Sequence, residues 1–74
     1  MSAKLKQNLI DKARLTYGLS FVLKDDIDTM RTYANNFEIE NLYESIRDVT
    51  DTLDKLIDTV AQLEYILYLE KLKR

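Results

Sequence analysis

Residues 38–72 read EIENLYESIRDVTDTLDKLIDTVAQLEYILYLEKL, and this stretch decides the fold. Its aliphatic residues follow one another at alternating intervals of three and four positions. An α-helix keeps such residues on one stripe, as in heptads (abcdefg) whose a and d positions are apolar. With Ile39 at position a, the stripe consists of Ile39, Leu42, Ile46, Val49, Leu53, Leu56, Val60, Leu63 and Leu67. The spacing predicts one long helix from about residue 38 to residue 72.

The first half of the chain keeps the same spacing with smaller side chains. Its stripe runs through positions 9, 13, 16, 20, 23, 27, 30, 34 and 37 and includes Ala13, Thr16 and Ser20. The chain has no Pro and only one Gly, Gly18, which favours an uninterrupted helix over about 3–34. In that reading Gly18 lets another helix approach closely. The alternative is a break near Gly18, which would give three helices.

The segment between these helices is short. Residues 33–37, with sequence YANNF, form the expected connection. Asn35 is a suitable N-cap, and Glu38 stands three residues later, as in a capping box. A connection of this length makes the two helices antiparallel neighbours. The predicted fold is therefore all-α, a single domain over residues 1–74 that forms a long helical hairpin.

A hairpin of 74 residues covers only one stripe of each helix, and a chain this small usually needs a further source of stability. The e and g positions of the second helix are almost uncharged, which widens its apolar face and is typical of bundles of three or four helices. We therefore expect a homodimeric four-helix bundle; a groove for a different protein is the alternative. The residues expected to mediate association are Tyr17, Phe21, Tyr65, Tyr68 and Leu72.

Charge is distributed unevenly along the chain, whose net charge is -2. The hairpin brings together two basic segments, and this basic end contains Lys4, Lys6, Lys71, Lys73 and Arg74. The middle of the chain is acidic. Its carboxylates on the second helix, called here the acidic ridge, are Glu40, Glu44, Asp48, Asp51, Asp54 and Asp58. The ridge is either a solvated surface that keeps a small bundle soluble or a contact surface for a basic partner.

The composition removes most catalytic chemistry. The chain has no His and no Cys, which excludes imidazole acid–base catalysis, thiol chemistry, disulfides and Cys/His zinc sites. The acidic run at Asp25, Asp26 and Asp28 lacks the glycine and the distal glutamate of a calcium loop, and a helix splays its carboxylates apart. We therefore expect no enzyme, no cofactor, no bound metal and no small-molecule substrate.

These observations leave three functional hypotheses. The first is a non-catalytic protein–protein interaction or regulatory module that acts as a small homo-oligomer. The second is an acidic inhibitor, of the phage type, that imitates nucleic-acid phosphates and docks on a nucleic-acid-binding protein. The third is a structural assembly subunit. We do not expect binding to nucleic acid, because the net charge is -2 and the chain has no Gly-rich loop and no defined recognition helix. We do not expect insertion into a membrane, because no apolar run approaches the length of a span. A cytoplasmic location is the expectation.

Overall fold

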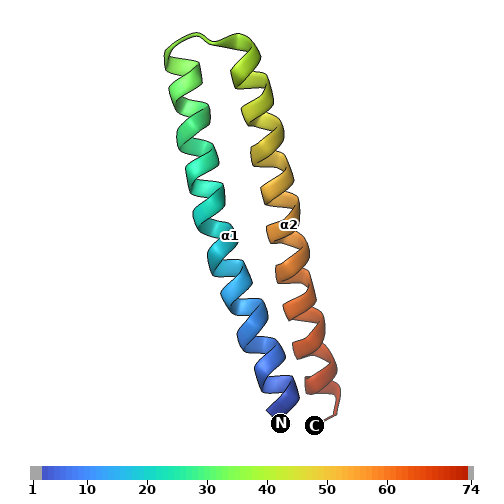
Figure 1. The fold of residues 1–74 in the computed structure, drawn as a ribbon. Helices are drawn as coiled ribbons and strands as arrows, with labels where there is room; N and C mark the ends of the chain where they lie inside the picture. The colour runs from blue at the N-terminus through green and yellow to red at the C-terminus, as the bar shows by residue number, and fades with distance from the viewer. Residues whose placement is uncertain (1–2, 74) are drawn as a thin grey trace.

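The computed structural model describes residues 3–73 and consists of two long antiparallel helices. Helix α1 spans Ala3–Asn35 and α2 spans Ile39–Leu72. They lie side by side in a rod that measures 55 × 17 × 12 Å, with both chain ends at one end of the rod (Figure 1). The predicted all-α hairpin is confirmed, and both helix boundaries differ from the predicted ones by at most one residue.

Helix α1 is continuous through Gly18, so the three-helix alternative is wrong. The expected reason for the glycine is not found within the hairpin either. A Cβ atom placed on Gly18 would meet nothing within 4 Å. The close approach of α2 therefore does not depend on Gly18, which lies on an open side of α1.

Residues 36–38 connect the helices, and they do so without the predicted capping box. Asn35 is the last residue of α1, and Glu38 precedes α2 without a side-chain capping hydrogen bond. The α1 end instead has the hydrogen bonds of a Schellman motif, from Phe37 N to Ala34 O (3.1 Å) and from Glu38 N to Tyr33 O (2.9 Å). Phe37 takes the left-handed position of this motif, with φ 57°, where Gly is the usual residue.

The helices contact each other along a seam that differs from the predicted one. On α2 the less exposed residues are the d and g columns, and the a column lies beside this seam and is exposed. On α1 only half of the predicted stripe takes part. The seam consists of Leu5, Leu9, Lys12, Thr16, Leu19, Leu23, Asp26, Met30 and Tyr33 on α1, and Leu42, Ser45, Val49, Thr52, Leu56, Thr59, Leu63, Ile66 and Glu70 on α2.

Small hydroxyl residues explain why the d and g columns, and not the a and d columns, pack against α1. Ser45, Thr52 and Thr59 occupy successive g positions and are the only buried residues of the described chain, at 4%, 8% and 5% exposure. Small side chains let two helix backbones come close, and the hydroxyl groups remain satisfied. Thr52 Oγ1 donates to Asp26 Oδ2 of α1 (2.9 Å), and Thr59 Oγ1 donates to the Lys55 carbonyl one turn earlier (2.8 Å).

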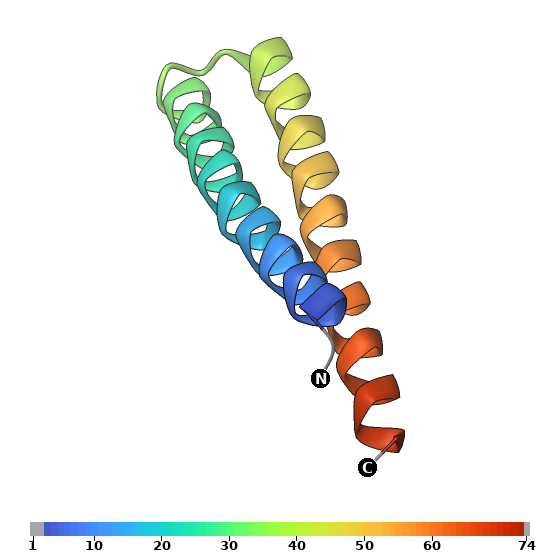
Figure 2. The same ribbon diagram turned by 60° about the horizontal axis from the view of Figure 1, so that its bottom comes forward.

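The hairpin has no apolar core of its own. Within residues 3–73 no apolar side chain is buried. The accessible surface is 6038 Å², whereas a compact monomer of 8.7 kDa exposes about 4700 Å². Seen from a second direction, both helices remain uncovered on their outer sides (Figure 2). The chain folds into a rod that leaves about 1300 Å² more surface in water than its mass requires.

Candidate association surfaces

The most extended apolar surface lies on one side of the rod and is called here the open face. An antiparallel helix pair has an approximate twofold axis perpendicular to its plane. Residues that follow a seam residue by one position therefore lie on the same side in both helices, as Ala13 does on α1 and Ile46 does on α2. The a and e columns of α2 give the open face Ile39, Tyr43, Ile46, Leu53, Ile57, Val60 and Leu67; α1 adds Ile10, Ala13, Tyr17, Ser20, Ile27 and Ala34.

Exposure shows that this face has no internal partner. On its α2 half, Leu53 and Val60 are 40% and 44% exposed and Tyr43 is 73% exposed. A shallow groove on the same side is lined by Leu56, Ile57, Val60, Ala61 and Glu64. Aliphatic side chains repeated over the length of a helix in water are unusual for a monomer, and contiguous apolar patches mark interaction surfaces.

The predicted association residues are all exposed, but the structure places them in separate groups. On α1, Tyr17 and Phe21 contact each other edge to face, with ring centroids 4.8 Å apart. Tyr17 belongs to the open face. Phe21 lies one turn further along α1, on the side of the helix away from α2. Their exposures of 68% and 52% leave most of both rings available to a partner.

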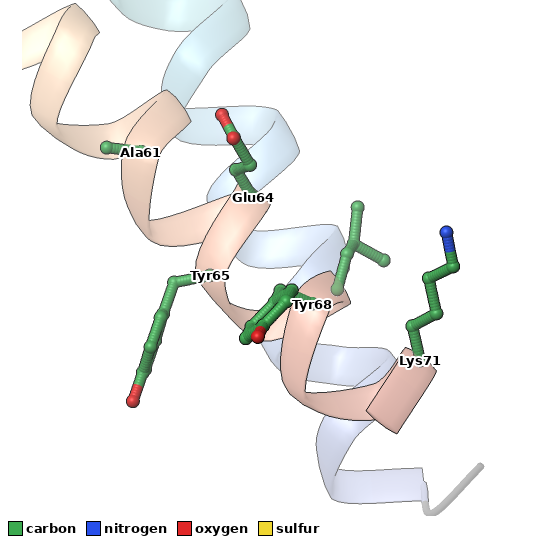
Figure 3. Close-up of a pocket in the computed structure, with 6 residues that line it drawn as sticks. Ala61, Glu64, Tyr65, Tyr68 and Lys71 are labelled. Atoms are coloured by element: carbon green, nitrogen blue, oxygen red, sulfur yellow. The ribbon is translucent and has the colours of Figure 1, made fainter. Parts of the chain in front are cut away.

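Near the end of α2, Tyr65 and Tyr68 line a second groove together with Ala61, Glu64, Leu67 and Lys71 (Figure 3). The two rings project from successive turns of the helix (Figure 3). Leu72 is 65% exposed and shares the f column with Tyr65. This groove therefore lies around the outer side of α2 and does not join Tyr17 and Phe21 in one patch.

The acidic ridge lies on other sides of α2 than the open face. All six of its carboxylate residues are exposed. Glu44, Asp51 and Asp58 form the f column, and Glu40 and Asp54 lie on the side opposite α1. From Glu44 to Asp58 the column extends about 21 Å at 1.5 Å per residue.

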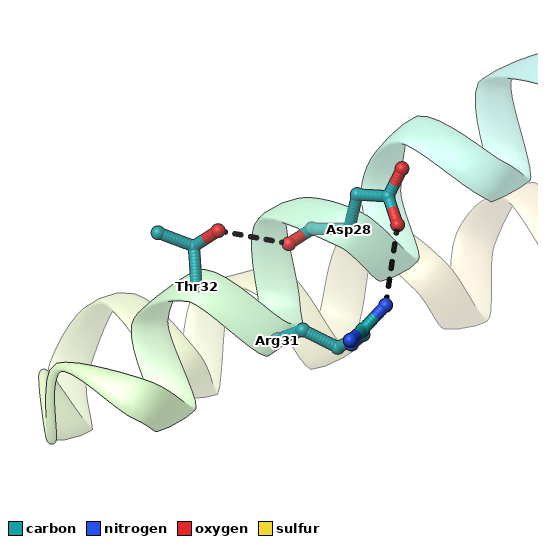
Figure 4. A network of polar contacts seen from close by, with 3 residues as sticks. All are labelled: Asp28, Arg31 and Thr32. Carbon is teal, nitrogen blue, oxygen red and sulfur yellow. Dashed lines mark hydrogen bonds and ion pairs between the residues drawn. The ribbon is translucent and has the colours of Figure 1, made fainter.

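Little within the chain neutralises these carboxylates. The ion pair recorded in residues 3–73 joins Arg31 and Asp28 on α1, with Nη1 and Oδ1 3.9 Å apart (Figure 4). On the ridge, Asp58 Oδ2 accepts a hydrogen bond from Gln62 Nε2 (3.1 Å). The negative charge of the ridge therefore remains available to a basic partner.

The basic end is assembled as expected, because the antiparallel hairpin brings both chain ends together (Figure 1). Lys4 and Lys6 on α1 and Lys71 and Lys73 at the end of α2 are exposed there. Arg74, the fifth predicted member, lies outside the described residues.

Two members of the acidic run on α1 have contacts within the chain. Asp26 accepts the hydrogen bond from Thr52 and Asp28 pairs with Arg31. Within the described residues, no group of three or more Asp and Glu side chains is arranged to hold a metal ion. None of the helices in this part of the chain has the length and apolar character that crossing a bilayer requires.

The sequence pattern did not identify the residues that determine which side of α2 packs against α1. The regular repeat of Ser45, Thr52 and Thr59 at seven-residue intervals was visible and marks the tight seam. Comparison of the chain with protein-family models, curated proteins and solved structures gives no match.

Proposed function

We propose that this chain is a non-catalytic interaction module that works as a self-associating helical hairpin, with the open face as its contact surface. One observation carries the proposal: the described chain buries no apolar side chain, while a complete column of large aliphatic residues faces water. Burial of apolar surface is the dominant favourable term in folding and association. A second hairpin on the open face supplies the missing core.

The available area supports a stable association. The excess over a compact monomer is about 1300 Å² per chain. Stable protein interfaces bury about 800 Å² on each partner. A second copy that covers the open face therefore has enough surface for a specific dimer and leaves the ridge residues Glu44, Asp51 and Asp58 in solvent.

The first experiment measures solution mass by light scattering behind size exclusion over a concentration series, with helicity followed by circular dichroism on the same samples. We expect a dimer of about twice 8.7 kDa whose helicity falls on dilution, because the isolated hairpin lacks a core. A monomer that stays fully helical at every concentration would overturn the proposal. Masses that grow beyond the dimer would favour the assembly subunit instead.

A matched pair of variants locates the contact. Leu53 on the open face and Leu69 on the opposite flank of α2 are both 40% exposed. Leu53→Gln removes about 2 kcal/mol of apolar burial from each chain of a dimer and is expected to raise the dissociation Kd at least a hundredfold. Leu69→Gln makes the same chemical change and should leave the Kd within a few-fold of the parent value. Equal effects of both substitutions would show that the open face is not the contact.

A second candidate function is an acidic inhibitor of a nucleic-acid-binding protein. It is favoured by the exposed acidic ridge, whose carboxylates remain outside the open face. Such a contact is electrostatic, and it should weaken steeply as ionic strength rises. A variant with Glu44, Asp51 and Asp58 all changed to neutral amides should lose binding to a basic DNA-binding domain and keep the parent solution mass. Binding that survives this variant would exclude the ridge as the contact.

A further inference from the structure

We infer that the second copy packs with its hairpin loop at the same end of the rod, so that α1 of each chain lies on α2 of its partner. This inference rests on the proposed function. Two twofold arrangements bring two open faces together. In one, the axis runs along the rod and α1 lies on the partner's α2. In the other, the axis crosses the rod, the loops lie at opposite ends, and each helix lies on its own copy.

Side-chain size distinguishes these arrangements. Next to the seam, the α1 half of the open face has three small residues, Ala13, Ser20 and Ala34, and one large residue, Ile27. The corresponding column of α2 has only large residues, such as Leu53 and Leu67. Placing α1 on the partner's α2 sets small residues against large ones along both edges of the interface. Placing each helix on its copy sets large against large at one edge and small against small at the other. Because protein interiors are close-packed, the first arrangement fills the interface evenly.

Charge on the α1 edge weighs against the crossed arrangement. The α1 edge of the open face carries Lys6, Lys24 and Arg31 and no acidic residue. If α1 lay on the partner's α1, the two helices would be antiparallel, and Lys6 of each chain would lie near Arg31 of the other. Like charges brought together across an interface disfavour that pairing.

Contacts within the chain show which residues lie at the same level along the rod. Asp26 bonds to Thr52, and Lys12 Nζ donates a hydrogen bond to Gln62 Oε1. An axis along the rod keeps every residue of the partner at the level it has in its own chain. Lys24 then lies level with the partner's Asp54, and Arg14 lies within about one turn of the partner's Glu64. Arg31 lies level with the partner's Arg47.

The first two pairs have opposite charge and flank an apolar contact, whereas the third is a like-charge pair nearer the loop. Between the levels of the first two pairs, Tyr17 of α1 lies level with the partner's Ile57, whose exposure within the chain is 59%. Each pair and the apolar contact occur twice in the dimer because the axis is twofold. The arrangement uses Asp54 of each acidic ridge, leaves the ridge residues Glu44, Asp51 and Asp58 on the outside, and gathers both basic ends at one end of the bundle.

The arrangement is tested by a distance between loops. The chain has no Cys, so Asn36→Cys introduces a single attachment point for a spin label at the loop. We expect a label-to-label distance on the order of 20 Å in the dimer, since packed helices lie 8–10 Å apart. The opposite arrangement would separate the labels by nearly the 55 Å length of the rod.

The outcomes separate this inference from the proposed function. A dimer with a long label distance overturns the arrangement and leaves self-association standing. A monomer across the whole concentration series overturns both. Open-ended growth of the assembly also overturns the arrangement, because contacts around a single twofold axis close at two copies.

Charge reversal provides an independent measurement. Lys24→Glu should raise the dimer Kd about tenfold, because each dimer contains the contact twice. Adding Asp54→Lys to the same chain should restore most of the loss. Lys55→Glu, the matched control on the opposite flank of α2, should change the Kd less than twofold. A Lys24→Glu variant that Asp54→Lys does not rescue would overturn the arrangement.

Discussion

The g and a columns of α2 flank the same apolar d column but differ in their exposure to solvent. The g column, with Ser45, Thr52 and Thr59, is buried against α1, whereas the a column keeps Leu53 and its aliphatic neighbours exposed. Hydrophobicity alone would favour burial of the a column and exposure of the g column. The difference shows that close approach of the helices, and not burial of the largest side chains, defines the inner seam. The larger side chains stay exposed, which is the basis of the self-association proposed above.

The largest expected effect comes from placing a larger side chain in the tight seam. Thr59 in the seam and Thr50 on the open face both donate a hydroxyl hydrogen bond to the carbonyl four residues earlier, at 2.8 and 2.9 Å. Thr59→Leu inserts volume into a site that is 5% exposed and should destabilise the fold by about 1–3 kcal/mol in chemical denaturation.

Thr50→Leu is the matched control for that change. It adds the same volume to an exposed site on the open face. We expect unchanged or tighter self-association and no loss of stability, since it adds apolar area to the contact. If both substitutions destabilised the fold equally, the distinction between a tight seam and an open face would be wrong.

A smaller effect is expected from the polar contact of the seam. Thr52 Oγ1 donates to Asp26 Oδ2 at 2.9 Å between the helices. A double-mutant cycle with Thr52→Val and Asp26→Asn should give a coupling energy of about 1 kcal/mol in denaturant unfolding. Additive single effects would show that small size alone defines the g column.

Gly18 provides a test on the side of α1 that nothing covers. A Cβ atom there meets no neighbour, so Gly18→Ala should stabilise the chain by about 0.5–1 kcal/mol through helix propensity. Thermal unfolding measured at one protein concentration reports the change. A lower melting temperature would mean that another helix packs on Gly18 and that the contact surface extends beyond the open face.

The smallest effect is expected at the loop, which connects α1 to α2. Phe37 has φ 57° and is 81% exposed, so it carries the cost of a left-handed conformation without a contact that repays it. Phe37→Gly should stabilise the fold by about 0.5 kcal/mol after its own entropy cost. Asn36→Gly, one residue earlier and without positive φ, should give no gain. Equal gains at both positions would show that strain at Phe37 is not the cause.

Much of the fold follows from the sequence. The alternation of three- and four-residue intervals, together with the absence of Pro, predicted both helices and placed their ends within one residue of those observed. The capping box at Asn35 and Glu38 was wrong. Asn35 stays in α1, and the Schellman motif at Phe37 satisfies the helix end, a choice that depends on loop geometry and has no glycine to announce it.

The sequence by itself determined the helices, their antiparallel pairing, the basic end and the acidic ridge, because these depend on local periodicity and on charge order along the chain. Only the tertiary structure decided which side of α2 faces α1. An apolar stripe with uncharged flanks on both sides packs as well through a and d as through d and g, so its pattern leaves the rotation of the helix open. Close approach over Ser45, Thr52 and Thr59 fixes that rotation, and the exposed a column is its consequence.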